Sequence, residues 1–364
     1  MSTVSANGIS TSRRSSALRI LAWLFAILIL AIVGLIGYAY FIARSALPQL
    51  DGNLIVKGLS GQVKVTRDAH GVPTIEASSL EDLFFAQGYV TAQDRLWQMD
   101  IMRRFGAGEL SEILGEDTLK VDREQRILGL RAAAKKSLAM ASPRDRSYID
   151  AYAHGVNAFI ETHARSLPIE FHLLKYRPKP WLAEDSIVIA NQMVKDLNFY
   201  TFKDAITREK ILSRLGPELT ADLYVNRSWH DRPPTVMRED VNAQPAQGDS
   251  DKNKNNDDED DDDDDSGPDN VVTERTHSLE NWAQHAPEAV NGSNDWVVSG
   301  AHTVTGKPLL SNDMHLGHQM PNLWYEAHLK SGNNSVNLDV VGVSLPGMPY
   351  VIVGHNQRIA WGFT

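Results

Sequence analysis

The sequence predicts an α+β protein, with a mainly helical first part and a strand-rich last part, preceded by one transmembrane helix. Three observations support this fold class. An uncharged apolar run occupies residues 20–43, apolar residues at helical spacing recur between residues 78 and 223, and short alternating segments with glycine turns follow Ser293. With 364 residues, 42% of them hydrophobic, the chain suffices for two ordinary domains or one large one.

The composition excludes several kinds of site. No cysteine is present, which rules out disulfides, thiolate metal sites and cysteine nucleophiles. Most of the net charge of −10 belongs to residues 251–269, where eleven acidic side chains and two lysines give −9. The rest of the chain is therefore nearly neutral, and no basic face argues for binding to nucleic acid.

Residues 1–19 are polar and basic, with Arg13, Arg14 and Arg19, and Arg44 closes the apolar run. A run of twenty-odd apolar residues crosses a bilayer core of about 30 Å, whereas a cleaved signal peptide has an apolar region of about 7–15 residues. We therefore interpret residues 20–43 as a signal anchor. The preceding arginines predict a cytoplasmic segment 1–19 and a bulk that lies beyond the inner membrane, in the periplasm or exterior.

Residues 54–78 are typical of a β-hairpin, because alternating apolar and polar residues flank a turn at Asp68–Gly71. His70 lies in that turn and is expected to be solvated. Ser78 with Glu81 predicts a capping box at the start of a long helix, and Ser142 followed by proline predicts the start of another. Further helices are expected over Ile187–Leu197 and Asp204–Leu215, and two charged groups, Asp94 with Arg95 and Asp100 with Arg103 and Arg104, are interpreted as ion pairs at helix surfaces or between helices.

Residues 236–292 are interpreted as an acidic, disordered spacer, because residues 242–270 within it are rich in Asp, Asn, Lys, Gly and Pro and have nothing to bury. Six aspartates at Asp260–Asp265 could hold calcium weakly, but they lack the spaced ligands of a folded calcium loop, so a solvated spacer is favoured. Strands are predicted after it, over Trp296–Val298, Lys307–Leu310, Trp324–Leu329, Val336–Val343, Tyr350–Val353 and Ile359–Phe363.

Ser293 stands at the junction between the spacer and the strands and follows Gly292. If the bond between these two residues were cleaved, Ser293 would carry a hydroxyl and a free α-amine. An α-amine has a pKa of about 7.7–8.0, so it can accept the proton of its own residue's hydroxyl. Taken alone, this stretch favours an ordinary serine that opens a strand after a linker.

Four longer matches resemble the penicillin acylase (penicillin amidase) family of N-terminal-nucleophile hydrolases, on the branch of the cephalosporin and acyl-homoserine-lactone acylases. They occur in the family's order and cover most of the chain from about residue 54, apart from the spacer. The matches are VTRDAHGVPTIEA with AQGYVTAQDRLWQMDIMRRFGAGELSEILG, then GSNDWVVSG, LLSNDMHLG and LPGMPYVIVGHNQRIAWGFT.

The resemblance implies an αββα sandwich and roles for individual residues. Ser293 resembles the nucleophile at the start of the β subunit, and Gly292 the residue on the other side of an autocatalytic cut. His315 falls where this branch has a histidine near the nucleophile. The resulting division is an α-subunit region at 45–235, a spacer propeptide at 236–292 and a β subunit from 293 to 364. Met193, Leu197, Leu316 and Val353 are expected to form walls of an acyl pocket.

Two implied features are only partly matched by this sequence. The family binds a structural calcium, and the ligand from the α subunit should fall near Asp204, whereas no cofactor is expected for catalysis. One oxyanion donor is the backbone N–H that follows the WG-x-T tetrapeptide, here Trp361–Thr364. This donor, a second one from an asparagine and the other calcium ligands are expected beyond Thr364, so the β subunit is expected to be truncated.

We therefore expect a membrane-anchored precursor of an amide hydrolase that matures into an α/β heterodimer and acts on a β-lactam side chain or an acyl-homoserine lactone. The alternative is an inactive truncated fragment or a non-catalytic binding subunit tethered to the membrane. A non-enzymatic envelope protein with a calcium-binding acidic tract is a further alternative.

Overall fold

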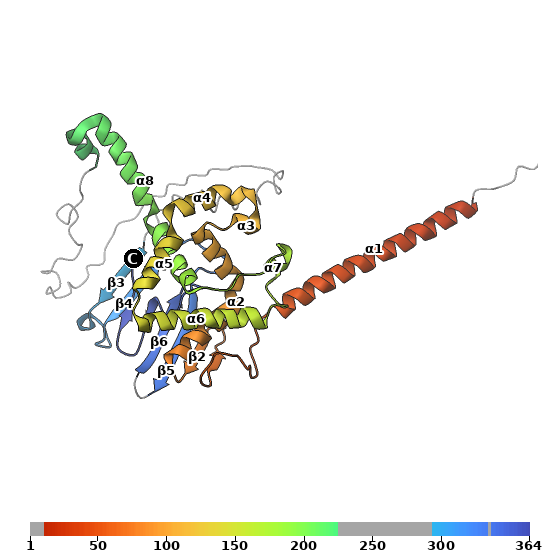
Figure 1. The fold of residues 1–364 in the computed structure, drawn as a ribbon, viewed down its shortest axis with the longest axis horizontal. Coiled ribbons are helices and arrows are strands. Elements are labelled where there is room, and N and C mark those ends of the chain that lie inside the picture. The colour runs from red at the N-terminus through yellow and green to blue at the C-terminus, as the bar shows by residue number, and fades with distance from the viewer. Residues whose placement is uncertain (1–10, 225–292, 334–335) are drawn as a thin grey trace, which may run out of the picture. The chain divides into compact units, whose positions relative to one another are not determined.

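The computed structural model describes residues 11–224, 293–333 and 336–364 (Figure 1). The chain divides into two compact units, one formed by residues 1–194 with 287–364 and the other by residues 195–286. The predicted spacer at 236–292, which includes Gly292, lies outside the described residues.

Helix α1 spans Thr11–Ser45 and includes the predicted apolar run. Its stretch from Leu18 to Ser45 has a mean hydropathy of 2.9 and exposed side chains, so by length and composition it could cross a membrane. A signal sequence near an N-terminus has the same properties. The assignment of α1 as a membrane anchor therefore stays a prediction.

Strands β1 (Lys64–Arg67) and β2 (Pro73–Ala77) are antiparallel, which confirms the predicted hairpin. Asp68 makes its turn, because one carboxylate oxygen accepts the backbone N–H groups of His70 at 2.8 Å and Val72 at 2.9 Å. The bond from Val72 is the main reason that the pKa of Asp68 is lowered. His70 has a side chain that is 88% exposed and is solvated as predicted.

Helix α2 (Leu80–Ala107) begins one residue later than predicted, since the N-cap is Ser79, whose hydroxyl accepts the N–H of Asp82 at 3.1 Å. The predicted cap at Ser78 is therefore wrong. Helix α6 (Pro143–Thr162) begins after Ser142, as predicted. The remaining helices of the first unit are α3 (Ser111–Leu114), η1 (Glu116–Thr118), α4 (Leu119–Leu128), α5 (Leu130–Met140), α7 (Ile169–Leu173), η3 (Gly300–His302) and the start of α8.

Helices α2 and α6 pack with their backbones in contact. A Cβ atom on Gly88 of α2 would collide with the carbonyl oxygen of Tyr152, and one on Gly155 of α6 would collide with that of Phe85. The two glycines therefore let the helices approach more closely than side chains would allow.

Helix α8 spans Ala183–Leu223, so the two helices predicted here are joined into one. The helical conformation breaks at Gly216, where φ is 75° and ψ is 174°, and it resumes at Pro217. Proline is tolerated there because the first residue of a helical segment needs no N–H bond. Residues up to Val194 belong to the first unit and the later ones to the second.

A six-stranded sheet has the order β1-β2-β5-β6-β7-β8. The pairing of β2 with β5 is parallel and the other pairings are antiparallel. The later strands confirm the predicted order with shifted ends: β5 is Tyr325–Asn333, β6 is Val336–Ser344, β7 is Val353–His355 and β8 is Ala360–Trp361.

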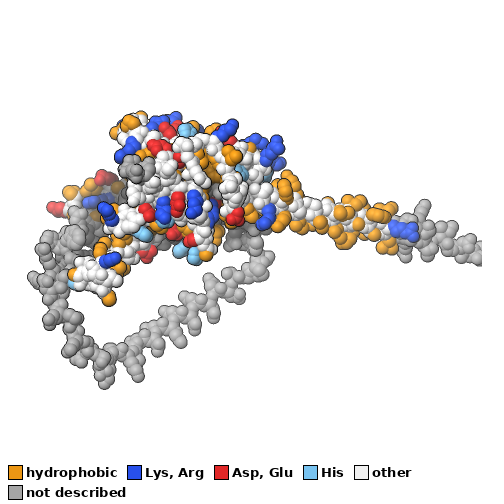
Figure 2. Space-filling model, turned by 90° about the horizontal axis from the view of Figure 1, so that it is seen from below, with side chains coloured by type: hydrophobic (Ala, Val, Ile, Leu, Met, Phe, Trp, Pro, Cys, Tyr) orange, Lys and Arg blue, Asp and Glu red, His pale blue; other side chains and the backbone are white. Residues whose placement is uncertain are grey.

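The two faces of this sheet differ in character. Ile75, Leu329 and Val340 point to one face and pack with apolar residues of α2 in a buried cluster, so helices cover this face (Figure 1). The alternate residues Lys64, Glu76, Lys330 and Asp339 are register neighbours across four strands and carry alternating charges. Red and blue side chains lie side by side on the surface in Figure 2.

The predicted strand Tyr350–Val353 is wrong at its start, because Tyr350 has a φ of 77° and precedes β7. The amide of Gln87 holds this residue by donating to its carbonyl at 3.0 Å and accepting its N–H at 3.0 Å. Gln87 is 1% exposed. A side chain of α2 therefore fixes a left-handed residue between β6 and β7.

Candidate active site

Ser293 is the first residue of β3 (Ser293–Val298), which pairs with β4 (Leu309–Met314) in a two-stranded antiparallel ribbon. Its register partner is Met314, the last residue of β4. Ser293 is half-buried, and the next four residues of the strand are exposed. The ribbon thus presents Ser293 at one end.

His315 directly follows Met314, so it lies at the same end of the ribbon as Ser293. Its Nε2 atom lies 2.9 Å from a carboxylate oxygen of Asp313, and the two side chains are 45% and 69% exposed. The contact described for the His315 ring is therefore with Asp313. The sequence reasoning did not single out Asp313, although its spacing of two from His315 on an extended segment was a usable signal.

Asn312 of β4 joins the ribbon to the Trp361–Thr364 segment. Its Nδ2 atom donates to the carbonyl oxygen of Phe363 at 2.8 Å and to that of Asn294 at 3.3 Å. Its Oδ1 atom accepts the N–H of Phe363 at 3.4 Å. Asn294 follows Ser293 in β3. The half-buried amide of Asn312 therefore contacts both the strand that begins at Ser293 and the Trp361–Thr364 segment.

The Trp361–Thr364 segment is also tied to the six-stranded sheet. The indole N–H of Trp361 donates to the carbonyl oxygen of Ile352 at 3.0 Å, just before β7. The ring of Phe363 lies 6.4 Å from that of Trp324, at an interplanar angle of 67°. This segment therefore bridges the sheet and the ribbon that carries Ser293.

In the part of the chain that the structure describes, each of the four residues predicted to line an acyl pocket has different neighbours. Met193 packs against the core cluster that contains Trp181 and Ile189. Val353 pairs with Val343 in the sheet, and Leu316 follows the ribbon, with its N–H bonded to Met314 at 2.9 Å. Leu197 belongs to the second unit. The predicted pocket therefore stays a prediction.

Asp204 lies on α8 in the second unit, and its side chain lies outside the described residues. Among the side chains that the structure does describe, no group of three or more His, Cys, Asp or Glu residues gathers as a metal site. No donor set for calcium can therefore be assembled from these residues, and the calcium ligand stays a prediction.

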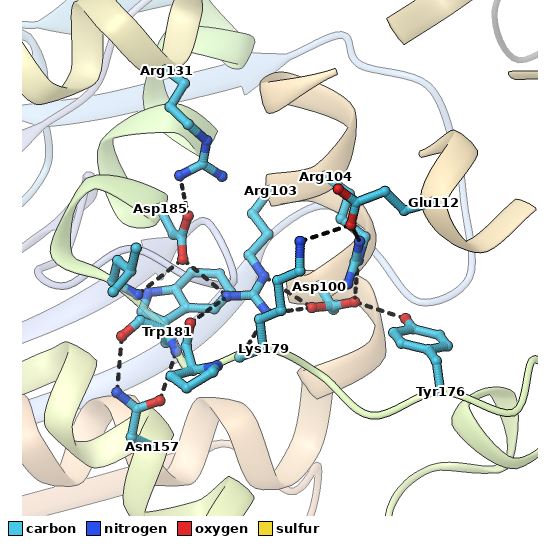
Figure 3. A network of polar contacts seen from close by, with 12 residues as sticks. Asp100, Arg103, Arg104, Glu112, Arg131, Asn157, Tyr176, Lys179, Trp181 and Asp185 are labelled. Atoms are coloured by element: carbon cyan, nitrogen blue, oxygen red, sulfur yellow. Dashed lines mark hydrogen bonds and ion pairs between the residues drawn. The ribbon is translucent and has the colours of Figure 1, made fainter. Parts of the chain in front are cut away.

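A buried ionic network supports the helices beside the sheet (Figure 3). The carboxylate of Asp100, 0% exposed, accepts bonds from Arg103 at 2.9 Å, from Arg104 at 2.8 Å and from the hydroxyl of Tyr176 at 2.7 Å. Burial raises the pKa of Asp100, but the two arginine charges outweigh it and hold the pKa below its ordinary value. The predicted ion pairs of this group are thus present and buried.

The same network reaches the first turn of α8. Asp185, 2% exposed, accepts one bond from Arg103 at 2.9 Å and one from Arg131 at 2.9 Å. The guanidinium of Arg103 lies 4.9 Å from the ring centre of Trp181. Asn157 of α6 holds the backbone of Trp181 by a two-way amide contact, with distances of 2.8 Å and 2.6 Å.

Asp94 pairs with Arg67 of β1 instead of its neighbour Arg95, the partner that the sequence suggested. It accepts two bonds from Arg67, at 2.8 Å and 3.0 Å, and one from the hydroxyl of Tyr325 at 2.6 Å. This contact joins β1, α2 and β5. Burial, followed by the charge of Asp94, raises the pKa of Tyr325 well above its ordinary value.

The sequence of this chain is similar to one family model and to several known proteins of related description. Residues 62–364 match the family model described as penicillin amidase. The chain is 31% identical over 322 residues to the acyl-homoserine lactone acylase QuiP of Pseudomonas aeruginosa, covering 88% of this chain and 35% of that protein. It is 30% identical over 325 residues to the penicillin acylase 2 proenzyme of a Pseudomonas species, covering 88% of this chain and 38% of that protein.

Among solved structures, a thermostable penicillin G acylase from Alcaligenes faecalis is 30% identical, with a TM-score of 0.41. That similarity covers 48% of this chain and 96% of the other. The chain spans 35% and 38% of the length of the two curated relatives above.

Proposed function

Because this chain belongs to the penicillin amidase family, we propose that it carries the nucleophile of an amide hydrolase, Ser293, which becomes N-terminal after cleavage of the bond to Gly292. The observation that carries the proposal is the position of Ser293 as the first residue of β3, opposite the residue that precedes His315. The alternative is an inactive fragment or a non-catalytic binding subunit, which would share these positions without turnover.

The proposed reaction is acyl transfer in two steps. The α-amine of Ser293 accepts the hydroxyl proton while the oxygen attacks the substrate carbonyl. The carbon–nitrogen bond then breaks, the amine leaves with a proton, and the acyl group stays on Ser293 as an ester. Water attacks the ester, the α-amine again accepts a proton, and the acid is released.

Cleavage at Gly292 would use the same hydroxyl. Attack of the Ser293 oxygen on the Gly292 carbonyl gives an ester by N-to-O acyl shift, and water hydrolyses that ester to free the amine. Glycine suits this position because it tolerates backbone conformations that other residues resist. The spacer at 236–292 would be removed, and the two remaining segments would form an α/β heterodimer.

His315 and Asp313 would order the end of the ribbon beside the nucleophile. The resemblance is what supports a role for His315 in orienting Ser293 and in contributing a backbone group to substrate binding; in the structure its ring contacts the Asp313 carboxylate at 2.9 Å. Within the first unit, the acyl walls proposed are Met193, Leu316 and Val353, and Leu316 and Val353 favour an aliphatic acyl group. We propose N-acyl homoserine lactones and β-lactams with acyl side chains as the substrate classes, since the relatives are named for them.

Further proposals concern the whole protein. The αββα sandwich, the anchoring of α1 in the inner membrane and a periplasmic or exterior location follow from the resemblance and from the apolar stretch of α1. A structural calcium near Asp204 is proposed on the resemblance alone, and no catalytic step passes through it.

The test is to express the protein at its natural length and to determine the N-termini of its products. A product that begins Ser-Asn-Asp-Trp is expected in the wild type and absent in Ser293→Ala. The purified wild type should then release acid from an N-acyl homoserine lactone or a penicillin. An uncleaved wild type that resembles Ser293→Ala would refute the proposal, whereas cleavage without turnover would favour the non-catalytic alternative.

A further inference from the structure

We infer that Asn312 is a positioning residue of this site, which fixes the backbone N–H and C=O of Phe363 relative to the strand that begins at Ser293. The inference rests on the proposed function, because it concerns the rate at which Ser293 attacks a carbonyl group. The Asn312 side chain bonds to backbone groups of Phe363 and Asn294. It acts by holding them in place and is not a catalytic residue.

The first support is the pattern of its hydrogen bonds. The Asn312 amide donates to the Phe363 carbonyl at 2.8 Å and accepts the Phe363 N–H at 3.4 Å. It also donates to the carbonyl of Asn294, the residue after Ser293, at 3.3 Å. A side chain that bonds to both segments couples their positions, since neither can move without lengthening one of these bonds.

The second support is the contact with Gly362. A Cβ atom at this position would lie 2.7 Å from both Cβ and Cγ of Asn312 and 2.8 Å from its Oδ1. Such distances are too short for real atoms, so the backbone at Gly362 lies flat on the Asn312 side chain. Only glycine permits this approach.

The third support is the geometry of the peptide group. In a trans peptide the C=O and the following N–H point in opposite directions. When Asn312 holds the Phe363 carbonyl toward β4, the N–H of Thr364 must point away from β4. The amide therefore sets the orientation of the backbone at the end of this segment as well as its distance from the ribbon.

Orientation matters in acyl transfer because backbone N–H groups polarise the substrate carbonyl as negative charge develops on its oxygen. By the resemblance, the Trp361–Thr364 tetrapeptide leads into such a group. A displacement of about 1 Å between nucleophile and polarising group can lower the rate by about 10²-fold. Asn312 is placed to prevent that displacement because it contacts both parts.

The test compares Asn312→Ala, Asn312→Asp and Gly362→Ala with the wild type, all at natural length. The aspartate variant keeps an acceptor for the Phe363 N–H but sets a carboxylate against two carbonyl oxygens. Asn157→Ala is the matched control, because Asn157 makes an equivalent two-way contact to the backbone of Trp181 at 2.8 Å and 2.6 Å. The probe is a p-nitrophenyl acyl ester, with acyl-Ser293 identified by mass spectrometry.

We expect the acylation rate per reactive Ser293, normalised to the size of the p-nitrophenol burst, to fall about 10–100-fold in each of the three variants. The KM should change little, and the apparent pKa in the pH profile should stay that of the wild type. Asn157→Ala should change the size of the p-nitrophenol burst but keep the acylation rate per reactive Ser293.

The outcomes separate the two proposals. A wild type that forms no acyl-Ser293 refutes the proposed function and this inference together. A wild type that reacts, with Asn312 and Gly362 variants that keep its rate per site, overturns this inference alone. A smaller burst at an unchanged rate per site also overturns it, because Asn312 would then stabilise the fold without positioning the site.

Discussion

The substitution Asp100→Asn tests whether the buried ionic network stabilises the fold. The Asp100 carboxylate accepts bonds from Arg103, Arg104 and Tyr176. An asparagine keeps one acceptor oxygen and presents an NH₂ group where the other oxygen stood. If the remaining acceptor oxygen stays on Arg103, the donors of Arg104 and Tyr176 face an N–H group. The buried Arg104 guanidinium then loses one carboxylate partner and keeps Glu112, at 3.0 Å.

Loss of one partner of a buried ion pair costs about 3–5 kcal/mol. For a domain of 150–250 residues, each kcal/mol shifts the midpoint of thermal unfolding by about 2–4 °C. The midpoint of Asp100→Asn should therefore fall by about 6–20 °C. Near-ultraviolet circular dichroism of the aromatic side chains can follow this transition; among them is the buried Trp181, whose indole lies 4.9 Å from the Arg103 guanidinium.

The control is Asp150→Asn, because Asp150 pairs with Arg146 at 3.0 Å with side chains that are 37% and 47% exposed. An exposed pair of this kind contributes at most about 0.5 kcal/mol. If the free energies of unfolding of the two variants differ by less than about 1 kcal/mol, the reasoning about the buried carboxylate is wrong.

The difference between wild type and Asp100→Asn should also depend on pH. The arginines hold the pKa of Asp100 below its ordinary value in the folded state, while the unfolded value is about 3.9. The carboxylate therefore stabilises the fold fully above about pH 4, and this stabilisation is lost as the pH falls through the lowered pKa. The two proteins should differ most at neutral pH and converge in acid.

Two further substitutions test the packing around α2. Gly155→Ala should destabilise the protein by about 1–3 kcal/mol, because the added methyl meets the Phe85 carbonyl; urea unfolding should detect this, while Gly34→Ala, which meets nothing, should cause no loss. Gln87→Leu leaves the backbone N–H and C=O of Tyr350 without their partner and should cost about 2–4 kcal/mol by the same assay. A loss below about 0.5 kcal/mol in either variant would contradict the contact from which it is argued.

The local elements could be predicted from sequence because their causes are local. The turn at Asp68 needs only a carboxylate that reaches N–H groups two and four residues later, and Ser142 with proline starts α6 by its own chemistry. Errors arose where two similar signals compete. Ser78 and Ser79 are both good caps, and only the structure shows that Ser79 accepts the N–H of Asp82.

The candidate site could be predicted only in part. Ser293 and His315 came from the resemblance, and the pairing of Ser293 with Met314 required the register of the ribbon. Asn312 contacts Phe363 across 51 residues, and Gln87 contacts Tyr350 across 263. Periodicity reports which face of an element is buried, but it carries no information on which distant backbone group an amide will meet.

Three side-chain amides make the same kind of contact to irregular backbone, for the same physical reason. Gln87, Asn157 and Asn312 each lie on a regular element, and each bonds to both the N–H and the C=O of one residue in an irregular segment. A carboxamide is the side chain that can do this, because it donates and accepts without charge. A carboxylate would repel the carbonyl, and a hydroxyl is too small to span both groups.

Irregular backbone has no ladder or helical partner, so its polar groups must be satisfied in another way when they are buried. Here each amide satisfies two such groups and also fixes where the segment lies. The exchange of Asn312 for aspartate, which leaves the size and shape of the side chain almost unchanged, is therefore not conservative. Aspartate cannot donate to the carbonyl oxygens of Phe363 and Asn294. The exchange should therefore lower the acylation rate of Ser293, although it hardly changes the packed volume.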